Sequence, residues 1–89
     1  MTRRHKLLLR IRNSPRNVTL RDLAKLLKAY GFSLRRVKGS HHIFDGHVAG
    51  CKLHLSVPFA QPIKEAYVKD VLELIDQIES EESDEQGGQ

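Results

Sequence analysis

The chain has 89 residues, a formal net charge of +4 and a single cysteine, so it has room for one small domain. One thiol forms no internal disulfide and by itself supplies neither a metal cage nor a redox pair, which fits a reducing cytosol. The apolar run at residues 7–9 is too short for a signal peptide, and no run of 18 apolar residues occurs. We therefore expect a soluble cytoplasmic protein that does not enter a membrane.

The charge is distributed unevenly along the chain. Residues 1–64 contain 14 Lys and Arg against two Asp, a net charge of +12, whereas residues 65–89 contain one Lys against nine Asp and Glu, a net charge of −8. A body this basic attracts polyanions, because each cation that neutralises a phosphate releases a condensed counterion. Nucleic acid is the expected partner. An anionic membrane is a weaker alternative, because the predicted helices lack the Trp and Phe of an interfacial helix.

The first predicted element is a short basic helix over residues 3–12. Leu7, Leu8 and Ile11 fall on one side of it, although Leu9 lies outside this stripe. A break around Pro15 follows, since proline lacks an amide hydrogen and restricts the preceding residue. Residues 1–17 are therefore interpreted as a basic N-terminal helix and linker.

The second predicted helix has the clearest periodicity in the chain. Thr19 can cap its start, and Gly31 can end it because glycine tolerates the left-handed conformation that closes a helix. Its apolar face consists of Leu20, Leu23, Leu26, Leu27 and Tyr30.

Three strands are predicted next. Residues 32–37 alternate at first and then lose phase at Arg36-Val37, which indicates a strand with an irregular end. Lys38-Gly39 is typical of a tight hairpin turn, so residues 41–45 should return antiparallel, followed by a loop over residues 46–50. Residues 51–58 alternate most regularly, with Leu53, Leu55 and Val57 on one face and Lys52, His54 and Ser56 on the other.

The helical period returns over residues 64–79, and its apolar positions are Val68, Val71, Leu72, Ile75 and Ile78. Residues 80–89 contain no apolar side chain and many acidic ones, which predicts a disordered acidic tail. The fold class is therefore α+β, with a three-stranded antiparallel sheet packed on one face by helices and an extra helix at the N-terminus.

This order of elements, with Gly-Ser-His at the first hairpin, resembles the HicA family, the small toxins of bacterial toxin–antitoxin pairs. The resemblance covers about Val18 to Ile78, and we assign residues 18–79 to a HicA-like domain. The resemblance rests on Leu26-Leu27, Tyr30-Gly31-Phe32, the block Lys38-Gly39-Ser40-His41-His42-Ile43-Phe44, the strand end Val57-Pro58 and the helix from Lys64 to Ile75. One departure is Pro58-Phe59-Ala60-Gln61, where the short members of the family often have a histidine soon after the proline.

The resemblance implies a fold like that of double-stranded-RNA-binding domains and an endoribonuclease that cleaves mRNA without a metal or another cofactor. It places the catalytic residue at the histidine after Gly-Ser, which is His41. It also implies a HicB-like antitoxin partner that covers the His41 edge.

Histidine suits this chemistry, because both of its protonation states are populated near neutral pH and it can serve as acid or base. The RNA or phosphate is expected to be held by Lys38, Gly39, Ser40, Arg35, Arg36 and Lys52. Two other interpretations stay open. His41 can be a turn-edge histidine with a local hydrogen bond, and the protein can be a non-catalytic RNA-binding module on the same fold. The remaining histidines and Cys51 fit no standard zinc spacing.

Overall fold

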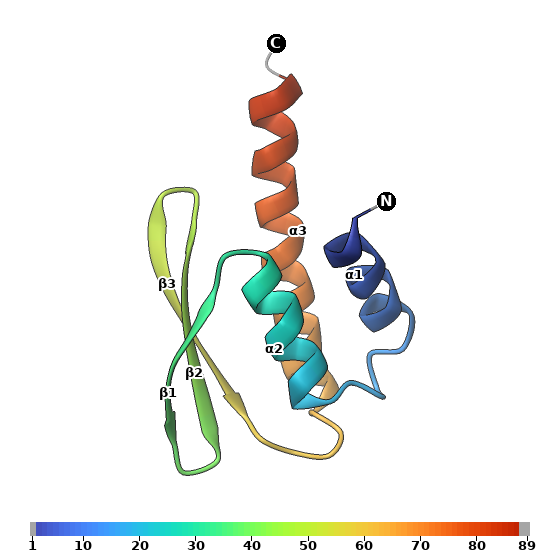
Figure 1. Ribbon diagram of the computed structural model, residues 1–89, viewed down its shortest axis with the longest axis vertical. Coiled ribbons are helices and arrows are strands. Elements are labelled where there is room, and N and C mark those ends of the chain that lie inside the picture. Colours follow the sequence, from blue (N-terminus) through green and yellow to red (C-terminus); the bar gives the residue numbers. More distant parts are fainter. Residues whose placement is uncertain (1, 88–89) are drawn as a thin grey trace.

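The computed structural model describes the backbone of residues 2–87 and the side chains of residues 2–82. Its elements in chain order are α1 (Arg3–Asn13), α2 (Leu20–Ala29), β1 (Ser33–Lys38), β2 (His41–Val48), β3 (Cys51–Pro58) and α3 (Glu65–Gly87). The strands form one antiparallel sheet in the order β1-β2-β3. In Figure 1 the helices α2 and α3 lie on one side of the sheet, and α1 packs beyond them. The predicted fold class is confirmed.

The core lies between the sheet and the layer formed by α2 and α3. It contains side chains from all three helices, including two from α1, because Leu8 and Ile11 are 1% and 2% exposed. Its largest fully buried members elsewhere are Phe44, Leu23, Leu26, Leu27, Ile63 and Ile75. The helical stripes predicted from the sequence therefore face this core, as their 3.6-residue period requires.

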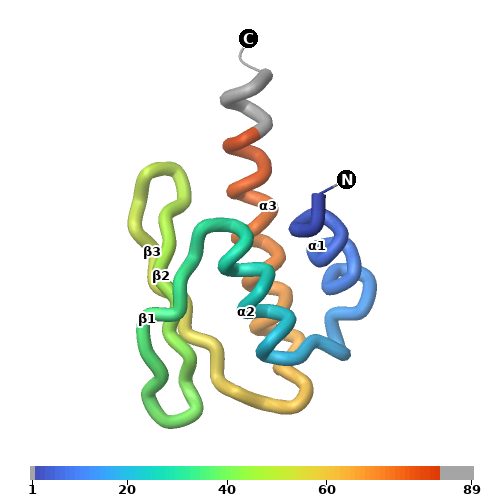
Figure 2. Tube along the Cα trace, viewed as in Figure 1, coloured from blue at the N-terminus to red at the C-terminus, as the bar shows by residue number. Residues whose placement is uncertain are grey.

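The ends of α2 form as predicted. The Thr19 side chain accepts a hydrogen bond from the Asp22 amide, which satisfies one of the free donors at the helix start. Gly31, with φ of +93°, follows the helix in a conformation that favours glycine. The connection from β3 to α3 passes below the start of α2 in Figure 2, where the Ile63 amide donates to the Val18 carbonyl at 2.9 Å.

The irregular end predicted for the first strand is a β-bulge. Leu34 pairs with Phe44 and Arg36 pairs with Ile43, so Arg35 has no opposite residue on β2. A bulge inserts one extra residue into one strand and turns the following side chains relative to regular alternation. The change of phase at Arg36 has this cause.

The loop predicted over residues 46–50 is wrong, because β2 continues to Val48 and only Ala49-Gly50 forms the turn. Both turn residues have positive φ, +56° and +77°, as a two-residue hairpin turn of type I′ requires. Gly46 suggested a loop from the sequence, but it is buried inside β2 opposite Leu53.

The last helix also differs from the prediction. It begins at Glu65 and runs to Gly87, so the residues expected to start a disordered tail at Ser80 continue α3. Two acidic side chains of this extension have partners in the body: Glu81 accepts from the Ala49 amide at 2.8 Å, and Glu82 binds Arg4 at 2.6 Å. Such contacts are non-local and cannot be read from composition. Residues 88 and 89 of the predicted tail lie outside the described residues.

Candidate nucleic-acid site on the sheet

The hairpin between β1 and β2 has the predicted tight turn. Lys38 and His41 are the last paired residues, and Gly39, with φ of +61°, occupies the first central position. Glycine at that position is the mark of a type II′ turn, whose twist matches that of the flanking strands. The turn therefore holds the two histidines at the very start of β2.

His42 is oriented by contacts around the Ser40 carbonyl. That oxygen accepts from the Phe59 amide at 2.7 Å and lies 3.3 Å from His42 Nδ1. Because a carbonyl oxygen only accepts, Nδ1 carries the proton in this contact, and Nε2 makes no hydrogen bond within the described residues. The half-buried imidazole lies 6.4 Å from the ring of Phe59, centroid to centroid, and Phe59 is 48% exposed.

His41 points to the other side of the sheet. Successive side chains on a strand alternate between faces, and Phe44 marks the helix-covered face of β2. His42 shares that face, whereas His41 belongs to the open face. His41 is exposed and lies opposite Lys38 on β1 and Pro58 on β3.

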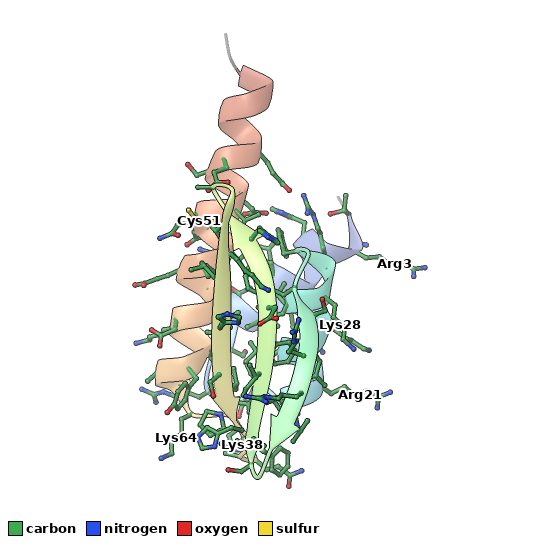
Figure 3. All side chains as sticks on the ribbon, turned by 90° about the vertical axis from the view of Figure 1, so that its left-hand side faces the viewer. Arg3, Arg21, Lys28, Lys38, Cys51 and Lys64 are labelled. Carbon is green, nitrogen blue, oxygen red and sulfur yellow. The ribbon has the colours of Figure 1, made fainter. Side chains whose placement is uncertain are left out.

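The residues predicted to hold the phosphate separate into two groups. Lys38 is paired with His41, and Gly39-Ser40 forms the turn beside them. Lys52 is instead paired with His47, six residues from His41 along β2, or about 20 Å at 3.3–3.4 Å per residue. Lys38 and Cys51 mark the two ends of the sheet in Figure 3. Lys52 and His41 therefore cannot contact the same phosphate.

The second group lies around Asp45 in the middle of the open face. Asp45 is paired with His54 on β3, and its Oδ1 contacts the Nδ1 atom of that ring. Arg35 Nη1 lies 3.4 Å from Asp45 Oδ2. The hydrogen bond from His54, assisted by Arg35 and Lys52, lowers the pKa of Asp45 from its ordinary value near 3.8, although burial acts in the opposite direction. The carboxylate is thus ionised at neutral pH.

Two hollows flank this group. One, of about 290 Å³, is lined by Arg35, Arg36, Ile43, Asp45 and His54. The other, of about 360 Å³, is lined by Gly31, Ser33, Leu34, Arg35, Asp45, Gly46, His47 and Lys52. Among the described residues, no three His, Cys, Asp or Glu side chains lie close enough together to hold a metal ion.

The sequence did not single out Asp45 and His54 as a pair. The available signals were the polar face predicted for His54 and the isolation of Asp45, which is the only acidic residue between Asp22 and Glu65. The pairing depends on the register of β2 and β3. Because residues 46–50 were predicted as a loop, the sequence did not give this register.

The basic residues of α1 and its linker are largely paired with acids. Arg12 binds Asp76 at 2.5 Å and Arg16 binds Glu65 at 3.1 Å, both on α3. The other pairs are Arg4 with Glu82 and Arg10 with Asp22, and His5 Nδ1 lies 3.8 Å from Glu79. These residues of α1 and its linker are less available for phosphate than the sequence suggests. Among the described side chains, most Lys and Arg without an acidic partner therefore lie on the sheet and α2.

No helix in the described part of the chain is both long and apolar enough to cross a membrane. Comparison with curated proteins gave no match, and comparison with solved structures gave none either. A family model described as the HicA toxin of bacterial toxin-antitoxin matches residues 20–77, more than half of the chain. The match leaves out α1 and covers the three strands with the Gly-Ser-His turn. This chain therefore belongs to the HicA toxin family.

Proposed function

We propose that this protein is a toxin that cleaves mRNA as a metal-independent endoribonuclease, with its acid–base group in the pair His41–His42. The observation that carries the proposal is that two histidines begin β2 directly after the Gly39-Ser40 turn, with His41 paired to Lys38. Family membership supports the toxin role. We infer the nuclease activity from the chemistry of the site.

RNA supplies its own nucleophile. The ribose 2′-oxygen attacks the adjacent phosphorus, the bond to the 5′-oxygen breaks, and the products are a 2′,3′-cyclic phosphate and a 5′-hydroxyl. A base takes the proton from the 2′-hydroxyl and an acid gives one to the departing 5′-oxygen. A positioned histidine contributes roughly 10²–10⁴ in rate to such a transfer. Lys38 and the Gly39-Ser40 amides are the groups that we propose to stabilise the phosphate.

The two histidines make different contributions to this proposal. The resemblance assigns the catalytic role to His41, whose ring is exposed on the open face. The contacts favour His42, because its Nδ1 lies 3.3 Å from the Ser40 carbonyl, which orients the ring. Single substitutions of each residue separate the two assignments.

The test measures cleavage of single-stranded RNA in the presence of a chelator by wild type, His41→Ala, His42→Ala and the matched control His47→Ala. His47 is an exposed histidine near the opposite end of β2. We expect the wild type and the control to cleave, and substitution of the catalytic histidine to slow cleavage about 100-fold or more. Equal rates in all four proteins would refute the acid–base assignment. RNA binding without cleavage by the wild type would favour the non-catalytic module.

We further propose that a HicB-like antitoxin covers the histidine turn. Val37 and Phe59, which are 51% and 48% exposed, provide apolar surface on either side of His42. Burial of such a patch is a usual source of affinity at protein interfaces. Val37→Asp should weaken antitoxin binding, whereas Leu53→Asp at the far end of the sheet should not, and equal affinity of both variants would contradict this placement.

A further inference from the structure

Asp45 has an unusual environment for an acidic residue on the open face of a sheet. Its side chain is only 12% exposed, and within the described part of the chain its buried Oδ2 atom accepts no hydrogen bond. The same carboxylate contacts His54 through Oδ1 and faces Arg35 through Oδ2. Asp45 therefore places one imidazole and one guanidinium next to each other on the face that no helix covers.

The β-bulge in β1 brings Arg35 to this place. Arg35 is the residue without an opposite partner, and the next residue, Arg36, pairs with Ile43 on the open face. Regular alternation would have turned one of these two arginines toward the helices. Both instead line the same hollow as Asp45 and His54.

The polar atoms of this group that face away from Asp45 are exposed to solvent. His54 Nδ1 is engaged by Asp45, so the other ring nitrogen, Nε2, lies on the opposite side of an imidazole that is 65% exposed. The guanidinium of Arg35 is also 65% exposed and uses one nitrogen toward Asp45, which leaves further N–H donors. Converging N–H donors with net positive charge are the arrangement that binds a phosphate group.

We propose that His54, held by Asp45, forms with Arg35 and Arg36 a second phosphate-binding site, which takes a phosphate of the same RNA strand that is cut at His41. Asp45 lies four residues from His41 along β2, or about 13 Å. One phosphate cannot contact both places, so the second site binds the strand away from the cut. This inference rests on the proposed function and adds to it a strand path over the open face.

Protonation of His54 decides whether this site is complete. With Nδ1–H donated to Asp45, a neutral ring presents only an acceptor at Nε2, and a phosphate oxygen is also an acceptor. The protonated ring presents a donor instead. The charged groups around it are Asp45 on β2, Arg35 and Arg36 on β1, and Lys52 on β3. Binding at this site should therefore be stronger when the ring is protonated than when it is neutral.

The experiment uses the full chain with His41→Ala and His42→Ala combined, so that RNA is bound without being cut. The affinity for a single-stranded RNA long enough to cover the sheet is measured by fluorescence anisotropy at about pH 6 and about pH 8. Further substitutions are His54→Ala and Arg35→Ala, with Arg3→Ala and His5→Ala, both on α1, as the matched controls. Arg35→Ala removes an exposed side chain, so its effect can be measured even where His54→Ala alters the fold.

We expect His54→Ala to weaken binding about 3- to 10-fold at the lower pH and much less at the higher pH, in line with an exposed charge-assisted hydrogen bond. Arg35→Ala should weaken binding at both pH values, and the controls should change it less than twofold. Cleavage of a dinucleotide, which carries one phosphate, should be insensitive to His54→Ala in the otherwise wild-type protein.

The outcomes separate this inference from the proposed function. Unchanged RNA affinity in both His54→Ala and Arg35→Ala, with RNA still cleaved by the wild type, would overturn the second site alone. If the wild type neither binds nor cleaves RNA, the proposed function fails and the second site fails with it. A loss of affinity for His54→Ala that is equal at both pH values would remove the role assigned to the protonated ring.

Discussion

The ring of Phe32 packs directly against the backbone of Gly46. A Cβ atom built on Gly46 would lie 2.5 Å from the Phe32 Cγ atom, which is closer than two carbon atoms can approach. Phe32 is 2% exposed and joins α2 to β1, so the contact places the start of the sheet against the middle of β2. Glycine at residue 46 is therefore a requirement of packing within a strand.

Replacing Gly46 with alanine should destabilise the fold by about 1–3 kcal/mol, because the Phe32 ring and the strand must move apart. Urea unfolding followed by circular dichroism measures the change. Gly39→Ala is the control, since open space surrounds that position and only its positive φ opposes a side chain. It should cost about 1–2 kcal/mol, from backbone strain alone. A Gly46→Ala variant as stable as wild type would contradict the packing described here.

The turn between β2 and β3 can be improved. Ala49 has φ of +56°, a left-handed conformation that alanine adopts at a cost and that asparagine tolerates better. Ala49→Asn creates an Asn-Gly turn with Gly50 and should raise the free energy of unfolding by about 0.5–1 kcal/mol. Thermal unfolding is the measurement. An unchanged or lower midpoint would show that residue 49 is not strained in the folded protein.

The N-terminal helix should be part of the cooperative fold, although the family match begins at residue 20. Leu8→Ala removes a side chain that is 1% exposed and should cost about 2–5 kcal/mol. Leu9→Ala, one residue further along the same helix but only half-buried, should cost about 1 kcal/mol or less. Equal effects in denaturant unfolding would indicate that α1 does not pack on the core.

The lowered pKa of Asp45 predicts how stability depends on pH. In the folded protein the ionised form of Asp45 is favoured over the protonated form, chiefly by the His54 hydrogen bond. The resulting stabilisation is fully present at pH values above the ordinary pKa of an aspartate, near 3.8. As the pH falls through the lower folded-state pKa, the carboxylate is protonated and that contribution disappears. The unfolding midpoints of wild type and Asp45→Asn should therefore differ most near neutral pH and converge in strong acid.

The comparison of wild type with Asp45→Asn across pH also removes the contributions of other carboxylates. Glu65, whose pKa is lowered chiefly by its hydrogen bond to Arg16, is another carboxylate that acid protonates, but it belongs to α3. It is present in both proteins, so its contribution cancels from their difference. A difference between wild type and Asp45→Asn that grows toward acidic pH would have the wrong sign for a carboxylate stabilised by His54.

The sequence by itself determined the local features of this protein. Periodicity located the three helices, Thr19 and Gly31 marked the ends of α2, and the loss of phase at Arg36 indicated an irregular strand, which the structure shows to be a bulge. These features depend on residues within one or two turns of each other, so their signals lie close together in the chain. The histidine pair next to a Gly-Ser turn was visible for the same reason.

Only the tertiary structure decided which distant residues meet. The register of β2 and β3 brought His54 to Asp45, and the bulge added Arg35; a shift of one residue would have turned these side chains to opposite faces. Arg12 and Asp76 are 64 residues apart, and their pairing reduced the positive charge that α1 offers to RNA. Composition counts charges without showing which of them lie together, and strand register and helix packing determine that.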